Sequence, residues 1–430
     1  MLKLICMLFV SIMTSMFFFP FEFVFLPNVN TKMILAGLGL MCLFVNLSRG
    51  TQRGVLNHDL FNLSIWAMLI SFISFAAVTF NDTYDYTFVT YIVSMWVWLG
   101  GAYAVTCMMK VLHGHLNVIL VCQYLIAVCV GQCIIAYSMD YFPILKEYVD
   151  NLLGSTGFMG KVEDRLYGIG ASLDVAGMRF SAVLLIIGYL CVHLEKGTGG
   201  LRRCCYIFSF LIIVFVGNMI GRTTTVGAIM VLLYWLSLWV IGNDNQRLEV
   251  RRTILLLGGV LLVVLPVVIY NYHVNISLQN NIRFAFEGFF SLMERGKWET
   301  HSNEILKNMY VFPDNIKTWL IGDGYFDNPY YSDLYYTGPK WAGFYKQTDV
   351  GYLRFIFYAG IFCMLAFVVY FFKVAQMCIH RFKDYTLLFG AILLLNYIVW
   401  FKVSSDLFPV FAIFLCVTTS DLEIAENTKS

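Results

Sequence analysis

Several charged residues of this chain have the chemistry to bind phosphate groups or to move the proton of a hydroxyl group. Arginine presents a planar fork of N–H donors that fits two phosphate oxygens at once. Aspartate and histidine can accept a proton from a hydroxyl group. Residues of these types lie in the polar segment 271–350 and at the ends of apolar segments: Arg165, Arg179, Arg222, Arg295, His301, Asp349 and Arg354.

Arg222 follows Gly221 and precedes three threonines, so hydroxyl-bearing residues surround one cation between two apolar segments. A lipid-linked diphosphate carries its charges at such a boundary, where an arginine fork could bind it. An arginine that binds phospholipid headgroups is the alternative. Arg179 lies about one turn inside an apolar segment, which is unfavourable unless the side chain faces water or a partner. Pairing with Asp174, snorkelling to the interface and substrate contact are all open for Arg179.

Asp349 and Arg354 flank Gly351-Tyr352, where the chain returns to apolar sequence. A helical path would place the two side chains on similar faces. The pair is either a salt bridge at a helix end, which contributes little at a surface, or an acid–base carboxylate beside a phosphate-binding cation. His301 lies near Arg295 in the sequence, and a single histidine has a structural role more often than a catalytic one.

The segment from Asn281 to Met309 predicts two amphipathic helices, with Phe284 in the apolar row of the first. Gly322-Asp323-Gly324 predicts a tight turn, and it lacks the remaining glycines and the context of a nucleotide-binding loop. The segment from Trp319 to Tyr345 is rich in aromatic residues. Aromatic rings are suited to binding sugars, which have apolar faces and polar edges; an interfacial aromatic belt is the alternative. These residues are Trp319, Tyr325, Phe326, Tyr330, Tyr331, Tyr335, Tyr336, Trp341, Phe344 and Tyr345.

The composition predicts an all-α polytopic membrane protein. The chain is 59% hydrophobic and 13% charged, with a mean hydropathy of +0.72, and a soluble domain could not bury so much apolar surface. The net charge of +2 gives no indication of a nucleic-acid partner. Apolar windows predict about twelve transmembrane helices, at residues 4–26, 33–47, 60–80, 87–109, 116–137, 175–194, 205–220, 222–242, 253–270, 351–372, 386–402 and 407–419.

The distribution of lysine and arginine predicts the orientation. One set of short connections is rich in these residues, whereas the opposite set carries only Lys32 and Lys402. The first set should be cytoplasmic, which places both termini inside and segment 138–174, Arg222 and segment 271–350 outside. The chain then divides into nine spans with one outer segment (1–270), a large outer loop (271–350), and three spans with a cytoplasmic tail (351–430). The outer segments lack clustered metal ligands, so we expect no metal site.

Together these features resemble the O-antigen and capsular polysaccharide repeat-unit polymerases of the Wzy type. The resemblance rests on Arg165-Leu-Tyr-Gly168, on Gly221-Arg222-Thr at the start of a span, and on the late outer loop with Gly322-Asp-Gly-Tyr325 and Thr348-Asp-Val-Gly-Tyr-Leu-Arg354. The arrangement of spans and loops is similar over most of the chain, whereas the matching motifs include few residues. The related O-antigen ligases usually have His-Asn where this chain has Asp349-Val350, which makes the ligase the less favoured alternative.

The resemblance implies a GT-C-like enzyme of the bacterial inner membrane that joins undecaprenyl-diphosphate-linked repeat units at the periplasmic face. It implies no cofactor, nucleotide sugar or metal. The implied partners are lipid-linked oligosaccharides, membrane lipids and a chain-length regulator protein. Another lipid-dependent glycosyltransferase, and a transporter or flippase, are alternatives. The implied roles are diphosphate binding for Arg165, Arg222 and Arg354 with Arg295 and Arg179, proton transfer for Asp349 or His301, and glycan binding for Tyr325, Trp341 and Tyr352.

Overall fold

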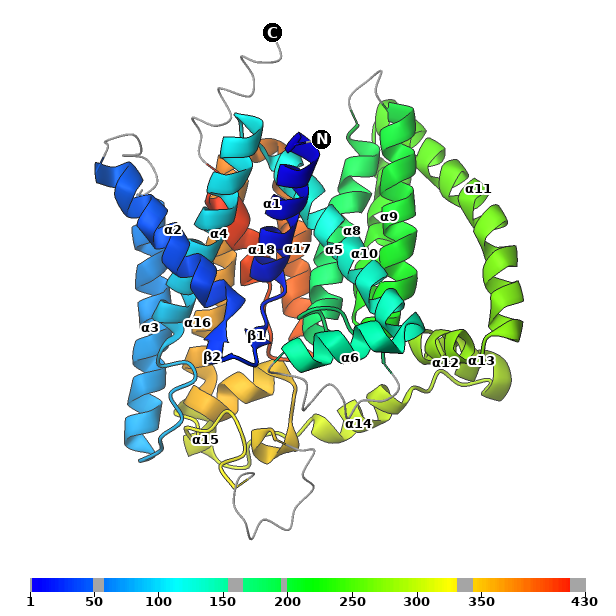
Figure 1. The fold of residues 1–430 in the computed structure, drawn as a ribbon. Coiled ribbons are helices and arrows are strands. Elements are labelled where there is room, and N and C mark those ends of the chain that lie inside the picture. Colours follow the sequence, from blue (N-terminus) through cyan, green and yellow to red (C-terminus); the bar gives the residue numbers. More distant parts are fainter. Residues whose placement is uncertain (1, 49–57, 154–164, 195–198, 331–342, 418–430) are drawn as a thin grey trace. The chain divides into compact units, whose positions relative to one another are not determined.

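The computed structural model describes residues 2–48, 58–153, 165–194, 199–330 and 343–417 (Figure 1). The chain forms two compact units, and each unit combines segments that are distant in sequence. Of the described residues, the first unit contains 2–35 and 105–298, and the second contains 36–104 and 299–417.

The first unit contains α1 (Leu2–Phe18), β1 (Glu22–Phe23), β2 (Leu26–Asn30), α5 (Val118–Tyr141), α6 (Pro143–Leu152), α8 (Leu173–Val192), α9 (Gly199–Ile220), α10 (Thr224–Ile241), α11 (Asp244–Val274), α12 (Ile276–Ala285) and α13 (Glu287–Arg295).

The second unit contains most of α2 (Thr31–Ser48) and α4 (Tyr91–His113), with α3 (His58–Phe80), α14 (His301–Met309), α15 (Ile316–Leu320), η1 (Tyr345–Gln347), α16 (Gly351–Arg381), η2 (Lys383–Tyr385), α17 (Thr386–Val399) and α18 (Phe408–Leu415).

Within the described ranges, eight helices are long and apolar enough to cross a bilayer: α3, α4, α5, α8, α9, α10, α11 and α16. The chain is therefore a multi-pass α-helical membrane protein. Helices α1 and α2 are apolar but shorter. Helix α18 has 8 residues, so it is about 12 Å long, against about 30 Å for the hydrocarbon core of a bilayer. Every expected span overlaps a helix, while the count of twelve crossings stays a prediction.

Two features of the first unit differ from the expected course of the chain. The first span was expected to reach residue 26, but α1 ends at Phe18. Pro20 follows closely, and the residue before a proline disfavours the helical conformation. The chain then forms a small antiparallel sheet of β1 and β2. Segment 138–174, expected as a loop, contains the short helix α6.

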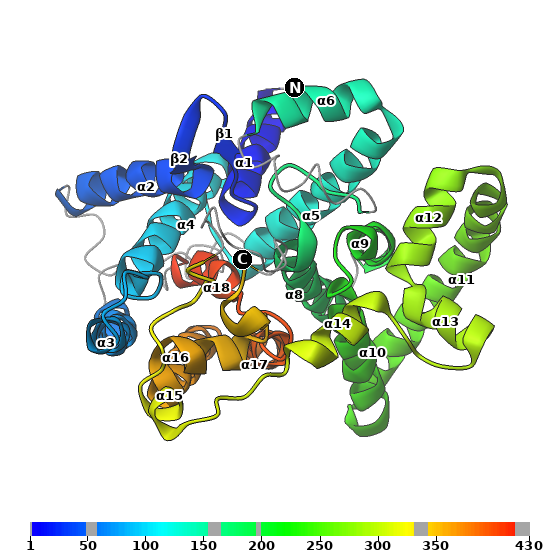
Figure 2. The same cartoon turned by 90° about the horizontal axis from the view of Figure 1, so that it is seen from below.

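Helices α8 and α11 of the first unit differ strongly in burial. Helix α8 packs against both α9 and α10 (Figures 1 and 2), and 94% of its apolar window is buried inside the protein. Only 6% of the corresponding window of α11 is buried. Because residues 254–270 of α11 are all apolar and mostly exposed, this part of the helix suits contact with lipid. The helix also extends to Val274, beyond the expected end at residue 270.

The polar segment after α11 forms more helices than expected. The sequence predicts two amphipathic helices between Asn281 and Met309, whereas the structure has α12, α13 and α14. The chain leaves helical geometry at Phe286, with φ −116° and ψ 28°, which separates α12 from α13. Side-chain periodicity continues across such a single-residue break, so the pattern alone could not locate it.

Helix α16 organises the second unit, where it packs against α3, α15, α17 and α18. It is kinked at Ala359 and Gly360, and Gly360 has a φ of 75° that favours glycine. The kink frees the carbonyl groups of the preceding turn. Asp323 and Gly324 donate their backbone N–H groups to the carbonyls of Phe357 (2.6 Å) and Tyr358 (3.0 Å), so the predicted tight turn is fixed to the kinked helix.

Candidate functional site

Arg165 and Arg222 come together in the first unit. Arg222 lies in the turn between α9 and α10. The backbone N–H of Leu166 donates to the carbonyl of Met219 near the end of α9 (3.3 Å). This hydrogen bond attaches the chain beside Arg165 to the helix that leads into the Arg222 turn. Two arginines that are distant in sequence therefore reach one place.

Gly221 explains how the start of α8 can lie directly on this turn. A Cβ atom at position 221 would overlap the carbonyl of Leu173, the first residue of α8. Thr223 strengthens the same contact, because its hydroxyl donates to the carboxylate of Asp174 in the first turn of α8. The glycine before Arg222 is thus required for close packing.

The side chains around Arg222 form a cluster of two guanidinium groups, one ring and one carboxylate. The guanidinium carbon of Arg222 lies 4.2 Å from the ring centroid of Phe284, and that of Arg165 lies 5.0 Å from the same centroid. Arg222 also forms an ion pair with Glu287. The Arg222 side chain is 16% exposed and that of Glu287 is 34% exposed. We call these four residues the Arg222 cluster.

Arg179 and Arg295, the two other arginines expected in this set, lie in different surroundings. Arg179 is buried, donates to the backbone carbonyl of Phe18 and lies over the rings of Phe18 and Phe19. This contact holds the end of α1 against α8. Arg295 is exposed in the last turn of α13, where a cation interacts favourably with the helix dipole. Neither environment by itself indicates a substrate contact.

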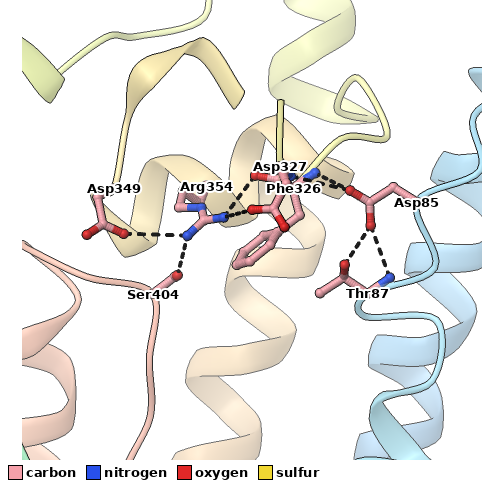
Figure 3. Close-up of polar contacts among 7 residues, drawn as sticks. All are labelled: Asp85, Thr87, Phe326, Asp327, Asp349, Arg354 and Ser404. Carbon is pink, nitrogen blue, oxygen red and sulfur yellow. Dashed lines mark hydrogen bonds and ion pairs between the residues drawn. The ribbon is translucent and has the colours of Figure 1, made fainter. Parts of the chain in front are cut away.

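The second unit holds a polar cluster around Arg354 (Figure 3). One terminal nitrogen, Nη1, donates to Ser404 Oγ (3.0 Å) and to Asp349 Oδ1 (3.4 Å). The other, Nη2, donates to Asp327 Oδ1 (2.8 Å) and to the carbonyl of Phe326 (2.9 Å). The expected contact between Asp349 and Arg354 is thereby confirmed, although its length makes it weak. A single guanidinium group holds two carboxylates.

Aromatic rings cover the same guanidinium group. The guanidinium carbon of Arg354 lies 3.4 Å from the ring centroid of Phe326 and 4.4 Å from that of Phe344. The Arg354 side chain is only 4% exposed, whereas Asp349 is 23% exposed. The cation is therefore fixed inside the cluster while the carboxylate of Asp349 reaches solvent. We call Arg354, Asp349, Asp327, Ser404 and the two phenylalanines the Arg354 cluster.

Asp85 attaches the Arg354 cluster to the chain between α3 and α4. Its carboxylate accepts the backbone N–H of Phe326 (2.8 Å) and also binds the backbone N–H and hydroxyl of Thr87 (Figure 3). Partial burial raises the pKa of Asp327 above its ordinary value, and nearby Asp85 adds to this shift, while Arg354 opposes it. The Asp327 side chain is 68% exposed, so Asp327 is a second carboxylate beside Arg354 that reaches solvent.

The remaining candidates from the sequence are placed as follows. His301 is the exposed first residue of α14. The ring of Tyr325 lies 5.4 Å from that of Tyr345. The hydroxyl of Tyr352 donates to the carbonyl of Tyr397 (2.9 Å), and its ring packs beside Trp400, so Tyr352 is engaged in helix packing. Trp341 lies outside the described residues.

The structure adds Asp85, Asp327, Phe284 and Glu287 to the residues that the sequence singled out. Asp85 lies 241 residues before Phe326, and no local sequence pattern predicts a contact over this distance in the chain. Phe284 is marked only as part of an apolar row. In the described part of the chain, no group of three or more His, Cys, Asp or Glu residues could hold a metal ion. No protein-family model, curated protein sequence or solved structure matches the chain.

Proposed function

We propose that this protein is a membrane glycosyltransferase that polymerises polyprenyl-diphosphate-linked oligosaccharide repeat units. The observation that carries the proposal is the Arg354 cluster, where a solvent-reaching carboxylate and a second carboxylate of raised pKa share one fixed cation. Such a pair suits the activation of a hydroxyl nucleophile. The twelve-span GT-C-like architecture and the location at the outer face of the bacterial inner membrane belong to the same proposal.

In the proposed reaction, a sugar hydroxyl of one lipid-linked unit attacks the anomeric carbon of the glycan on a second carrier. The new glycosidic bond forms as the bond from the anomeric carbon to the diphosphate oxygen breaks. Asp349 accepts the hydroxyl proton, and the polyprenyl diphosphate leaves with the bonding electron pair. Charge develops on the leaving diphosphate, so cations near it stabilise the transition state.

The two arginine clusters suit different tasks in this reaction. Both terminal nitrogens of Arg354 already donate within the protein, so Arg354 acts as a positioning residue for Asp349 and Asp327. Among the described residues, Arg222 forms its ion pair with Glu287, whose side chain is partly exposed. Arg222 and Arg165 are therefore the better candidates for binding a diphosphate. In this proposal, phosphate oxygens take the place of the Glu287 carboxylate on Arg222.

The test is reconstitution of the purified protein in liposomes with polyprenyl-diphosphate-linked repeat units. We expect a ladder of lipid-linked polymers on a gel and release of polyprenyl diphosphate in proportion to the bonds formed. Glycan transfer only to a lipid A core acceptor would identify a ligase instead. Movement of the lipid across the bilayer without new glycosidic bonds would identify a flippase and overturn the proposal.

A further inference from the structure

A polar cavity of about 670 Å³ lies in the second unit, beside the first turns of α16. Its volume falls within the range of about 300–1,000 Å³ that is usual for small-molecule sites. Side chains that line it include Phe312, Lys317, Asp323, Tyr345, Lys346 and Phe357. Aromatic faces and hydrogen-bonding groups therefore meet in one hollow of suitable size.

Asp323 presents a well-oriented carboxylate to this cavity. Its Oδ1 accepts from Lys317 Nζ (3.0 Å) and from Thr318 Oγ1 (2.7 Å), and its Oδ2 accepts from the Tyr345 hydroxyl (3.2 Å). An ionised carboxylate has about four lone-pair sites, so capacity remains for a ligand hydroxyl. Burial, and then the neighbouring Asp323, raise the pKa of Tyr345, which keeps its hydroxyl protonated as a donor.

The backbone around the cavity is held in unusual conformations. Asp323 lies between Gly322 and Gly324, whose φ angles are 82° and 75°. Lys346, which also lines the cavity, and the next residue, Gln347, have φ angles of 53° and 57°, a region that residues with a side chain rarely adopt. Such strain persists only where the surroundings impose it, and it is concentrated at functional sites. The cavity is thus a built feature of the fold.

We propose that this cavity binds a neutral sugar ring of the glycan substrate. The assignment rests on the proposed function in that the sugar belongs to a repeat unit. The charged residues of the lining are two lysines, Lys317 and Lys346, and two aspartates, Asp314 and Asp323, so their formal charges cancel. This balance disfavours a phosphate or an acidic sugar. The aromatic faces fit the apolar face of a sugar, and Asp323 fits its hydroxyl groups.

The cavity adjoins the Arg354 cluster along the chain and along α16. Phe344 covers Arg354, whereas the next residue, Tyr345, lines the cavity. Phe357 lines the cavity one helical turn after Arg354 on α16. A sugar bound in the cavity would therefore lie beside the carboxylates that the proposed reaction uses. The cavity gives the enzyme a means of selecting which sugar is presented for bond formation.

Saturation-transfer NMR on the purified protein in detergent tests the assignment without any lipid-linked substrate. The probes are glucose, galactose, mannose, rhamnose, N-acetylglucosamine and N-acetylgalactosamine, with glucuronate as the charged comparison. We expect at least one neutral sugar to receive saturation. Asp323→Asn should weaken its binding by about tenfold or more, because a hydrogen bond to a charged acceptor is lost.

A second variant keeps the test informative if Asp323→Asn does not fold. Phe312 is 61% exposed, so Phe312→Ala should fold normally and still weaken sugar binding several-fold. The matched control is Ile316→Ala: Ile316 is 77% exposed, lies on α15 and is outside the cavity lining. This control should bind sugar like the wild type.

The assignment is overturned if no neutral sugar binds the wild-type protein, if glucuronate alone binds, or if Phe312→Ala binds as tightly as Ile316→Ala. These outcomes are independent of catalysis, since no glycosidic bond forms in the assay. A protein that binds sugar in the cavity but makes no polymer in liposomes would retain the sugar site and lose the proposed function. If the protein makes polymer but the variants bind sugar as the wild type does, the proposed function is retained and the sugar site is rejected.

Discussion

Replacement of Asp349 by asparagine separates the chemical role of this residue from its structural role. Asparagine keeps the size of the side chain and removes its basicity. If Asp349 accepts the proton of the attacking hydroxyl, Asp349→Asn should fold normally and make little or no polymer. Lipid-linked single repeat units should then accumulate. Asp349→Glu keeps the base but changes its reach, so a trace of activity is expected.

The expected effect on stability is small and follows from the geometry. The contact of Asp349 with Arg354 is 3.4 Å long, and the Asp349 side chain is 23% exposed. An ion pair of this kind contributes about 0–1 kcal/mol. Arg354 also keeps its hydrogen bonds to Asp327, Ser404 and the Phe326 carbonyl in the variant. The midpoint of thermal unfolding should therefore fall by no more than about 4 °C.

The expected effect on rate is much larger. A positioned general base typically contributes a factor of about 10²–10⁴, so bond formation in liposomes should slow by that factor. The assay measures polymer on a gel and released polyprenyl diphosphate, with thermal unfolding recorded on the same preparation. If the loss of activity is accompanied by a fall in the unfolding midpoint well beyond about 4 °C, the result would count against a catalytic role for Asp349.

Two other residues could be the base, and the same assay distinguishes them. Asp327 makes the shorter bond to Arg354, at 2.8 Å, and its pKa is raised. If Asp349→Asn makes normal polymer and Asp327→Asn makes none, the assignment moves to Asp327. Activity should then decline, as the pH falls, at a higher pH than for an ordinary aspartate. His301→Ala tests the remaining rival, and loss of polymer in this variant alone would identify the histidine.

Three further predictions concern the diphosphate, the topology and metals. Arg222→Lys should insert normally but lose most activity, because lysine keeps the charge without the planar fork; polymer of wild-type length would reduce Arg222 to a headgroup or structural contact. Reporter fusions should place residue 300 outside the membrane and residues 52, 248 and 380 inside; an inside result for residue 300 would put the candidate sites on the wrong side. Reconstituted activity should survive excess EDTA. Complete loss of activity that Mg²⁺ or Mn²⁺ restores would make Asp323, Asp327 and Asp333, the last outside the described residues, candidate ligands.

The membrane class and most helices could be predicted from the sequence because apolar length is a local property. The same holds for the contact between Asp349 and Arg354, which are five residues apart and meet at the start of one helix. The turn at Gly322–Gly324 was also visible from its glycines. Each of these features depends on residues that are close in the chain, where periodicity and turn chemistry apply.

The partners that complete the two clusters could not be predicted in this way. Glu287 pairs with a residue 65 positions earlier, and Asp85 binds a backbone group 241 positions later. Their positions follow from tertiary packing. The kink at Gly360 was equally hidden, because a glycine inside an apolar segment is compatible with a straight helix. It nevertheless frees the carbonyl groups that hold Asp323 in place.

The different exposure of the two clusters decides which arginine can exchange its partner. The side chain of Glu287 is already 34% exposed. If Glu287 were released from Arg222, hydration of its carboxylate would therefore offset much of the free energy lost with the ion pair. A diphosphate would then replace one carboxylate with oxygens of higher charge. Release of both Asp327 and Asp349 from Arg354 would leave a guanidinium group that is 4% exposed without a carboxylate partner, and an unpaired buried charge is strongly unfavourable. Substrate exchange is therefore expected at Arg222, while Arg354 keeps the carboxylates in position throughout the reaction.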